Sequence, residues 1–309
     1  MEKKPLLSRG PVVVGLAILC NMLWGSAIPM INLGYKLFEI PTGKPAMQIF
    51  FAGVRFFIAG ALTILFPSIP RGALVVPKKE NIHMVVKLGF LQTVIQYVMF
   101  YIGVARTASV TGAIIQGLNA FVAILIACYV FRTEKMNRLK WLGGALGVLG
   151  VIVMNLGGGS FGGMTFTGEG FLLLSMIVSA CSAGAIKIFS QKEDPVALSG
   201  WQFMLGGFVM AVVGAVLGGR FPAVNIGAIG VLLYLAALSA IAYTLWGILL
   251  KYNPVSRIAP YMFLQPVFGV VLSLLLYGGD AQSLIRYGAA LVLVCMSILT
   301  IGRGQQEKH

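Results

Sequence analysis

Long apolar runs dominate this sequence and restrict what the chain can fold into. They last roughly 18 to 25 residues, the length that a helix needs to cross about 30 Å of hydrocarbon. The composition agrees with a bilayer, because the 309-residue chain is 58% hydrophobic and only 10% charged, whereas soluble proteins are about a quarter charged. Strands of a membrane barrel would be shorter and would alternate apolar with polar residues. The sequence therefore predicts an all-α membrane protein.

Breaks at glycine, proline and charged clusters divide the chain into ten predicted transmembrane helices. They lie near residues 12–33, 45–67, 84–105, 108–131, 139–156, 168–189, 196–218, 227–250, 254–277 and 284–302. Lys and Arg residues concentrate in the N-terminal segment and in alternate loops, such as those after the second and fourth spans. The positive-inside rule therefore places both termini in the cytoplasm. The formal net charge of +14 indicates this topology and not a nucleic acid partner.

Two stretches of the chain, residues 107–134 and 253–280, follow one pattern. Each opens with small or turn residues, carries an amide in its first half and ends at an acidic residue. Their alignment pairs Asn119 with Gln265, Tyr97 with Tyr243, and Glu134 with Asp280. The pattern predicts two repeats of five helices, residues 1–160 and 161–309. Because five is odd, the second repeat enters the membrane from the opposite side, and the expected site lies at the midplane between the halves.

Four segments carry a resemblance to a known family: WGSAIP at 24–29, VRFFIAGALTIL at 54–65, TEKMNRLKWLGGALGVLGV at 133–151 and LQPVFGVVLSLLLYGGD at 264–280. They resemble the EamA-type branch of the drug/metabolite transporter (DMT) superfamily, and the likeness covers nearly the whole chain. It implies a 5+5 inverted repeat, a central cavity lined mainly by spans 3, 4, 8 and 9, and export of small metabolites or drugs. The family's glutamate at the end of the fourth span is Glu134, whereas its counterpart Asp280 is displaced behind two glycines.

Arg55 is the clearest charged residue inside a predicted span, ten residues after Pro45. Gln48 lies two helical turns earlier on the same face, so the two side chains could share an anion or a carbonyl ligand. The alternative is structural, in which Arg55 bonds backbone carbonyls or an acidic residue and holds the bundle together. Ionisable residues inside a membrane are costly, and both interpretations stay open at this point.

Four predicted spans each present a stripe of amide or aromatic side chains at helical spacing. The candidate solute-binding residues on them are Gln92, Gln96, Tyr97, Gln116, Asn119, Tyr243, Trp246, Tyr261 and Gln265. The amides alone could be hydrogen bonds between helices. The aromatic residues favour a cavity, because structural Tyr and Trp prefer the membrane interfaces and these lie well inside their spans. Such a cavity suits flat neutral, zwitterionic or cationic organic solutes.

Stripes of small residues mark two further helices. In the sixth span, Ser175, Ser179 and Ser182 predict a close-packing face. In the fifth, Gly143, Gly147 and Gly150 predict a contact surface inside the fold or between protomers, and so a possible homodimer.

Catalytic and cofactor signals are missing from the sequence. All 9 acidic residues fall in loops or at span ends, and there are 2 histidines, which disfavours strong proton coupling. We find no ATP-binding motif, metal-ligand cluster or paired acids, and so expect neither a cofactor nor an enzyme.

The interpretation that follows is a secondary transporter of the bacterial inner membrane, working by alternating access. Its expected solutes are small organic metabolites, such as amino acids or related amphipathic or cationic compounds. One alternative is a nucleotide-sugar or phosphate-ester antiporter, which should need several cationic residues in the cavity. Another is a membrane scaffold or receptor that transports nothing, with every mid-span amide satisfied by a neighbour and no cavity of several hundred Å³.

Overall fold

The computed structural model describes residues 6–41, 43–104, 106–107, 109–155, 165–277 and 281–306, and all regular structure in these ranges is helical. The first half contains η1 (Leu6–Ser8), α1 (Gly10–Leu37), α2 (Pro45–Arg71), η2 (Lys79–Asn81), α3 (Ile82–Leu88), η3 (Gly89–Ile95), α4 (Gln96–Val104), α5 (Ser109–Gly117), α6 (Asn119–Leu125), η4 (Ile126–Val130) and α7 (Arg138–Asn155). The second contains η5 (Phe166–Gly170), α8 (Phe171–Phe189), α9 (Pro195–Val216), α10 (Ile226–Tyr252), α11 (Val255–Ile258), η6 (Ala259–Phe263), α12 (Leu264–Tyr277) and α13 (Ala281–Gln306).

Nine helical stretches of the described chain are long and apolar enough to cross a membrane. They correspond to nine of the predicted spans, and three of them join shorter pieces, as in η2, α3, η3 and α4. The remaining prediction, 108–131, falls on a shorter apolar helix, Ile114–Val130, which is interrupted at Leu118. A crossing by this segment stays a prediction.

Local signals in the sequence begin and end several helices. Pro45 and Pro195 occupy the first positions of α2 and α9, where a missing N–H costs nothing. Asp194 caps α9 by accepting a hydrogen bond from the backbone N–H of Val196 at 2.9 Å. Gly72, with φ of 63°, ends α2 in the left-handed conformation that favours glycine.

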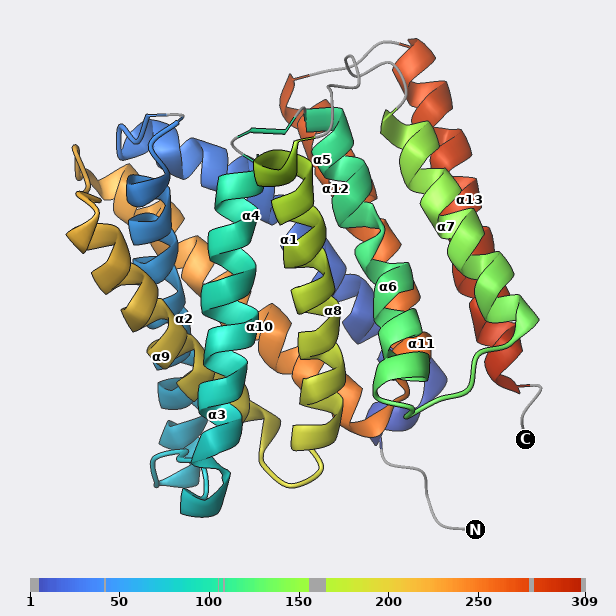
Figure 1. Ribbon diagram of the computed structural model, residues 1–309, viewed down its shortest axis with the longest axis horizontal. Coiled ribbons are helices and arrows are strands. Elements are labelled where there is room, and N and C mark those ends of the chain that lie inside the picture. Colours follow the sequence, from blue (N-terminus) through green and yellow to red (C-terminus); the bar gives the residue numbers. More distant parts are fainter. Residues whose placement is uncertain are drawn as a thin grey trace.

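Each half packs its helices against the other. α2 packs along α9, α7 along α13, α1 against α10 and α12, and α4 against α8 (Figure 1). The α2–α9 contact is close because a Cβ at Gly53 would lie 2.2 Å from the backbone nitrogen of Ala211. Such a separation is far inside van der Waals contact, so glycine permits these backbones to meet.

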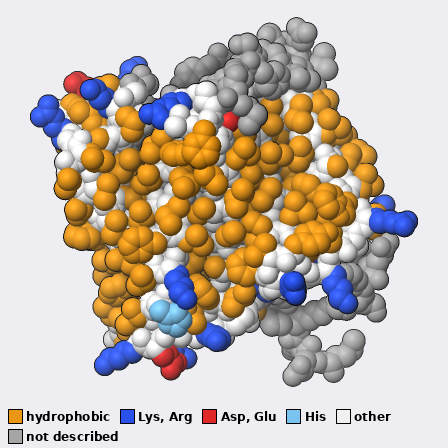
Figure 2. Space-filling model, viewed as in Figure 1, with side chains coloured by type: hydrophobic (Ala, Val, Ile, Leu, Met, Phe, Trp, Pro, Cys, Tyr) orange, Lys and Arg blue, Asp and Glu red, His pale blue; other side chains and the backbone are white. Residues whose placement is uncertain are grey.

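The surface distribution fits a protein that spans a bilayer. Figure 2 shows hydrophobic side chains over the middle of this face, with Lys and Arg toward its edges. In Figure 1 the first residues of α1 and the last residues of α13 lie at the same end of the bundle.

The glycine stripe of α7 lies inside the fold. A Cβ at Gly143 would meet Ile301 at 2.4 Å, one at Gly147 would meet Phe263 at 2.2 Å, and Gly150 faces Ala290. This face therefore packs against α13 and η6, so a homodimer would need another surface.

Candidate functional site

A cavity of about 190 Å³ lies between the two halves of the bundle. It is lined by nine of the ten residues that the sequence singled out, namely Arg55, Gln92, Gln96, Tyr97, Gln116, Asn119, Tyr243, Trp246 and Gln265. Their role as solute ligands stays a prediction. The structure brings together side chains from α2, η3, α4, α5, α6, α10 and α12 around this one cavity.

Tyr261 is the exception, since it does not line this cavity. The prediction assumed a regular α-helix that would place Tyr261 and Gln265 on one face. Residues Ala259–Phe263 instead form a 3₁₀ helix with Pro260 at its start, and its three residues per turn change the register. Met262 therefore lines the cavity with Gln265, and Tyr261 packs against the hydrophobic core beside it.

Aromatic side chains form one wall of the cavity. Trp24 meets the rings of Tyr243 and Trp246 edge to face, with centroids 5.0 and 5.1 Å apart. The hydroxyl groups of Tyr97 and Tyr243 are 2.5 Å apart, so two residues paired by the sequence repeat form a hydrogen bond across the halves. Tyr101, which the sequence analysis missed, also lines the cavity, one helical turn after Tyr97. Its spacing of four residues was the signal that could have found it.

Some amide side chains that line the cavity also make hydrogen bonds between helices. Gln92 accepts a bond from Gln202 of α9 at 3.0 Å, and Gln265 donates to Asn21 of α1 at 3.1 Å. Asn119 donates to Ser179 of α8 at 3.2 Å. These amides therefore line the cavity and also bond neighbouring helices, and their binding of a solute stays a prediction.

Other polar atoms around the cavity have no hydrogen-bond partner within the described chain. They are Trp24 Nε1, Arg55 Nη1, Gln96 Oε1, Gln116 Nε2 and Asn119 Oδ1. A buried polar group without a partner costs about 1–3 kcal/mol. Their concentration at one place identifies the cavity as a region where a ligand or water would be stabilised.

Two of the three serines on the predicted packing face of α8 also line the cavity. Ser175 and Ser179 line the cavity, and Ser175 donates to the backbone oxygen of Gln96 at 2.8 Å. Ser182, one turn further, is fully buried and bonds the carbonyl of Val178. The stripe is therefore divided, because α8 borders the cavity in its first half and other helices in its second.

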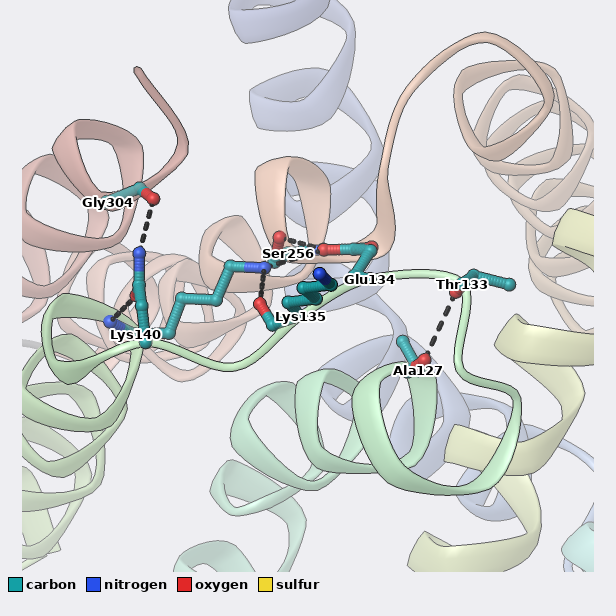
Figure 3. A network of polar contacts seen from close by, with 8 residues as sticks. Ala127, Thr133, Glu134, Lys135, Lys140, Ser256 and Gly304 are labelled. Carbon is teal, nitrogen blue, oxygen red and sulfur yellow. Dashed lines mark hydrogen bonds and ion pairs between the residues drawn. The ribbon is translucent and has the colours of Figure 1, made fainter. Parts of the chain in front are cut away.

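A polar network surrounds Glu134 in the loop between η4 and α7 (Figure 3). Glu134 accepts hydrogen bonds from the Ser256 backbone N–H at 3.1 Å and from its hydroxyl group. Lys140 donates to Glu134 and to the carbonyl of Lys135, each at 3.0 Å. The network joins the loop after η4 to α11 in the second half. Asp280, the repeat partner of Glu134, lies outside the described residues.

The charges and donors of the cavity limit its chemistry. Arg55 is the one charged side chain among its lining residues, and the described chain holds no cluster of His, Cys, Asp and Glu that could bind a metal. The site can hydrogen-bond and stack against a small organic molecule and can balance one negative charge.

Comparison with known proteins adds a family and relatives. The sequence profile of the EamA-like transporter family matches residues 12–156 and again 166–301. A probable amino-acid metabolite efflux pump of Escherichia coli is 26% identical, over 93% of this chain and 94% of that protein. The uncharacterized inner membrane transporter YedA of the same species is 25% identical, over 91% and 88%. A crystal structure with 13% identity superposes with a TM-score of 0.74, covers 96% of this chain and 99% of that one, and shows the fold alone.

Proposed function

The chain belongs to the EamA-like transporter family, and from that premise we propose that it moves small organic solutes across the membrane by alternating access. It is a multi-pass membrane protein whose relatives are named transporters or efflux pumps. The proposed activity is secondary transport without a cofactor, with export as the expected direction. The bacterial inner membrane is the proposed location, since YedA is named an inner membrane transporter.

The helix contacts support an arrangement of ten spans as a 5+5 inverted repeat, with halves 1–160 and 161–309. α2 with α9, and α7 with α13, join equivalent helices of the two halves. The contact of α1 with α10 becomes that of α8 with α4 when the halves are exchanged, and both contacts are present. This pattern is expected of a pseudo-twofold axis, and rocking of one half about such an axis would open the cavity to each side in turn. Both termini are placed in the cytoplasm in this proposal.

One observation carries the proposal: five unpartnered polar atoms belong to side chains that line a cavity between the halves. A scaffold or receptor that transports nothing has no reason to leave these groups unsatisfied at the centre of its fold, because each costs free energy. A carrier has such a reason, since a solute that supplies the missing partners is held at the midplane.

Amino acids or related amphipathic or cationic compounds are the proposed solutes. The cavity is smaller than the roughly 300–1,000 Å³ typical of drug-sized ligands, which favours a small molecule. Its aromatic wall suits an apolar or cationic side chain. A nucleotide sugar or phosphate ester carries two or more negative charges, and one lining arginine would leave part of that charge unbalanced.

A thermal-shift screen of the purified protein tests this proposal. Amino acids, organic cations, nucleosides and nucleotide sugars are compared, since a ligand at 100 times its Kd stabilises by about 2.7 kcal/mol. We expect stabilisation by amino acids or cations, lost in Gln116→Ala and kept in Gln191→Ala, an exposed amide outside the cavity. Stabilisation only by nucleotide sugars would move the assignment to the antiporter, and equal stabilisation of both variants would refute the cavity site.

A further inference from the structure

Arg55 is a buried cation at the cavity wall. The residue is 3% exposed, and it lies in the interior of α2, away from both ends of that helix. Its Nε and Nη2 donate to the hydroxyl of Ser239 at 3.3 and 3.1 Å, and its guanidinium carbon lies 4.7 Å from the centroid of the Phe56 ring. Nη1 has no hydrogen-bond partner. The two protein groups that hold Arg55 are therefore neutral.

No acidic residue balances this charge in the described part of the chain. The ion pairs there join Arg71 with Asp194 and Lys140 with Glu134, both away from the cavity, and the cavity lining contains no carboxylate. An unpaired charge inside a membrane protein is expensive, and removal of water from it is repaid only by a counter-charge with good hydrogen bonds. In the structural interpretation, Arg55 would bond an acidic residue or backbone carbonyls. The structure instead shows bonds from Arg55 to the hydroxyl group of Ser239.

The geometry points to a carboxylate binding site, and we propose that Arg55 pairs with the carboxylate of the transported solute. This inference rests on the proposed transport function and names its solute class: small organic molecules with one carboxylate. A carboxylate accepts parallel hydrogen bonds from a guanidinium, a stronger contact than either group makes with a neutral partner. A single arginine matches a single negative charge, which a dianionic phosphate would exceed.

The remaining unpartnered groups fit the other end of such a molecule. The amide oxygens of Gln96 and Asn119 lack donors, so either can accept a bond from an ammonium group. Both residues line the cavity with Arg55, and Trp24 and Trp246 offer an apolar wall. An α-amino acid therefore satisfies the cation, the acceptors and the wall together. A plain amine or an amino-acid amide leaves Arg55 unbalanced.

The test compares acids with their neutral amides. Leucine and phenylalanine, and the carboxamide of each, are measured by thermal shift and by exchange in proteoliposomes that contain the full-length protein. The amino group and side chain are the same within each pair, so the ratio of apparent affinities isolates the carboxylate. We expect the acids to bind at least tenfold more tightly than the amides in the wild-type protein.

Three variants separate charge from structure. In Arg55→Gln the ratio should fall to about one, and in Arg55→Lys a preference for the acids should persist. Ser239→Ala removes the neutral partner and keeps the charge, so it should keep the acid preference even where stability falls. If Arg55→Gln does not fold, the ratio of acid to amide affinities in the wild-type protein and in Arg55→Lys still tests the role of Arg55.

The outcomes distinguish this inference from the proposed function. Exchange of amides as fast as acids, or an acid preference that survives Arg55→Gln, overturns the role of Arg55 and leaves the transporter assignment standing. Absence of binding and exchange for all four probes counts against both. Loss of the acid preference in Arg55→Gln, with exchange of the amides retained, supports both.

Discussion

Loss of the negative charge of Glu134 should destabilise the protein more than loss of any surface ion pair. Its carboxylate serves Ser256 and Lys140 together, and the side chains of Glu134 and Lys140 are 8% and 5% exposed. In Glu134→Gln one amide oxygen replaces two carboxylate oxygens, and its NH₂ group has no acceptor on Lys140. The variant keeps the shape of the side chain and leaves a buried ammonium without its counter-charge.

The structure sets the expected size of this loss. Removal of one partner of a buried ion pair costs about 3–5 kcal/mol. Lys140 keeps its bond to the carbonyl of Lys135 at 3.0 Å, so we expect the lower end of that range, about 3 kcal/mol. The free energy of unfolding in detergent micelles, from denaturant titration, measures this loss.

A matched pair elsewhere in the chain provides the control. Arg71 and Asp194 are also 3.0 Å apart, but their side chains are 50% and 35% exposed. Arg71→Gln should cost about 1 kcal/mol or less, because water screens exposed pairs. The double variant Glu134→Gln, Lys140→Met should regain part of the loss, since the Lys140 ammonium is removed while the half-buried Lys187, which also interacts with Glu134, keeps its charge. Equal losses in Glu134→Gln and Arg71→Gln, or no recovery in the double variant, would refute the reasoning.

Three further predictions test packing, pH dependence and the contact between the halves. Gly53→Val should abolish the monodisperse peak in size-exclusion chromatography, because the valine side chain would separate α2 from α9. Gly15→Val should keep the peak, because there is open space around Gly15. A monodisperse peak for Gly53→Val would contradict this packing. Burial disfavours the charged form of Glu193, but hydrogen bonds from Asn81 and from backbone N–H groups outweigh burial and lower the pKa of its carboxyl group from the ordinary value of 4.5. The ionised Glu193 therefore stabilises the folded protein above the ordinary pKa. This stabilisation is lost as the pH falls through the lower pKa of the folded state. Melting temperatures measured between neutral and acid pH should therefore fall less for Glu193→Gln than for wild type, and parallel curves would argue against this role. Tyr97→Phe and Tyr243→Phe should each lower the free energy of unfolding, measured by denaturant titration, by about 1 kcal/mol. The double variant should lower it by little more, because the two hydroxyl groups share one hydrogen bond; additive losses would exclude a shared bond.

The helical architecture and most of the cavity could be predicted from the sequence because both depend on periodicity. Apolar runs fix where helices lie in a membrane, and amides or aromatics three or four residues apart must share a face. Gln116 and Asn119 reach the same cavity even though their helix is interrupted at Leu118, since one irregular turn changes the face little.

Other features depend on contacts that periodicity does not report. Tyr261 does not line the cavity, because the 3₁₀ turn at Pro260 changes the register of the helix locally. The serines of α8 could not be assigned, because a small polar residue suits a tight helix contact and a cavity wall equally well. That no acidic residue of the described chain pairs with Arg55 could not be predicted, because the pairing depends on where the loops and helix ends that carry the acidic residues lie in space.

Solute exchange in proteoliposomes tests the central claim, that solute passes through the cavity between the halves, most directly. Labelled leucine or phenylalanine is followed in vesicles with wild-type protein, Trp246→Ala or Trp141→Ala. Trp246 lines the cavity and is 5% exposed, whereas Trp141 is 48% exposed on the outer surface of α7. We expect Trp246→Ala to lower the exchange rate at least tenfold at equal protein content, and Trp141→Ala to exchange solute as fast as wild type. Exchange that is unchanged in Trp246→Ala, or lost equally in both variants, would contradict this claim.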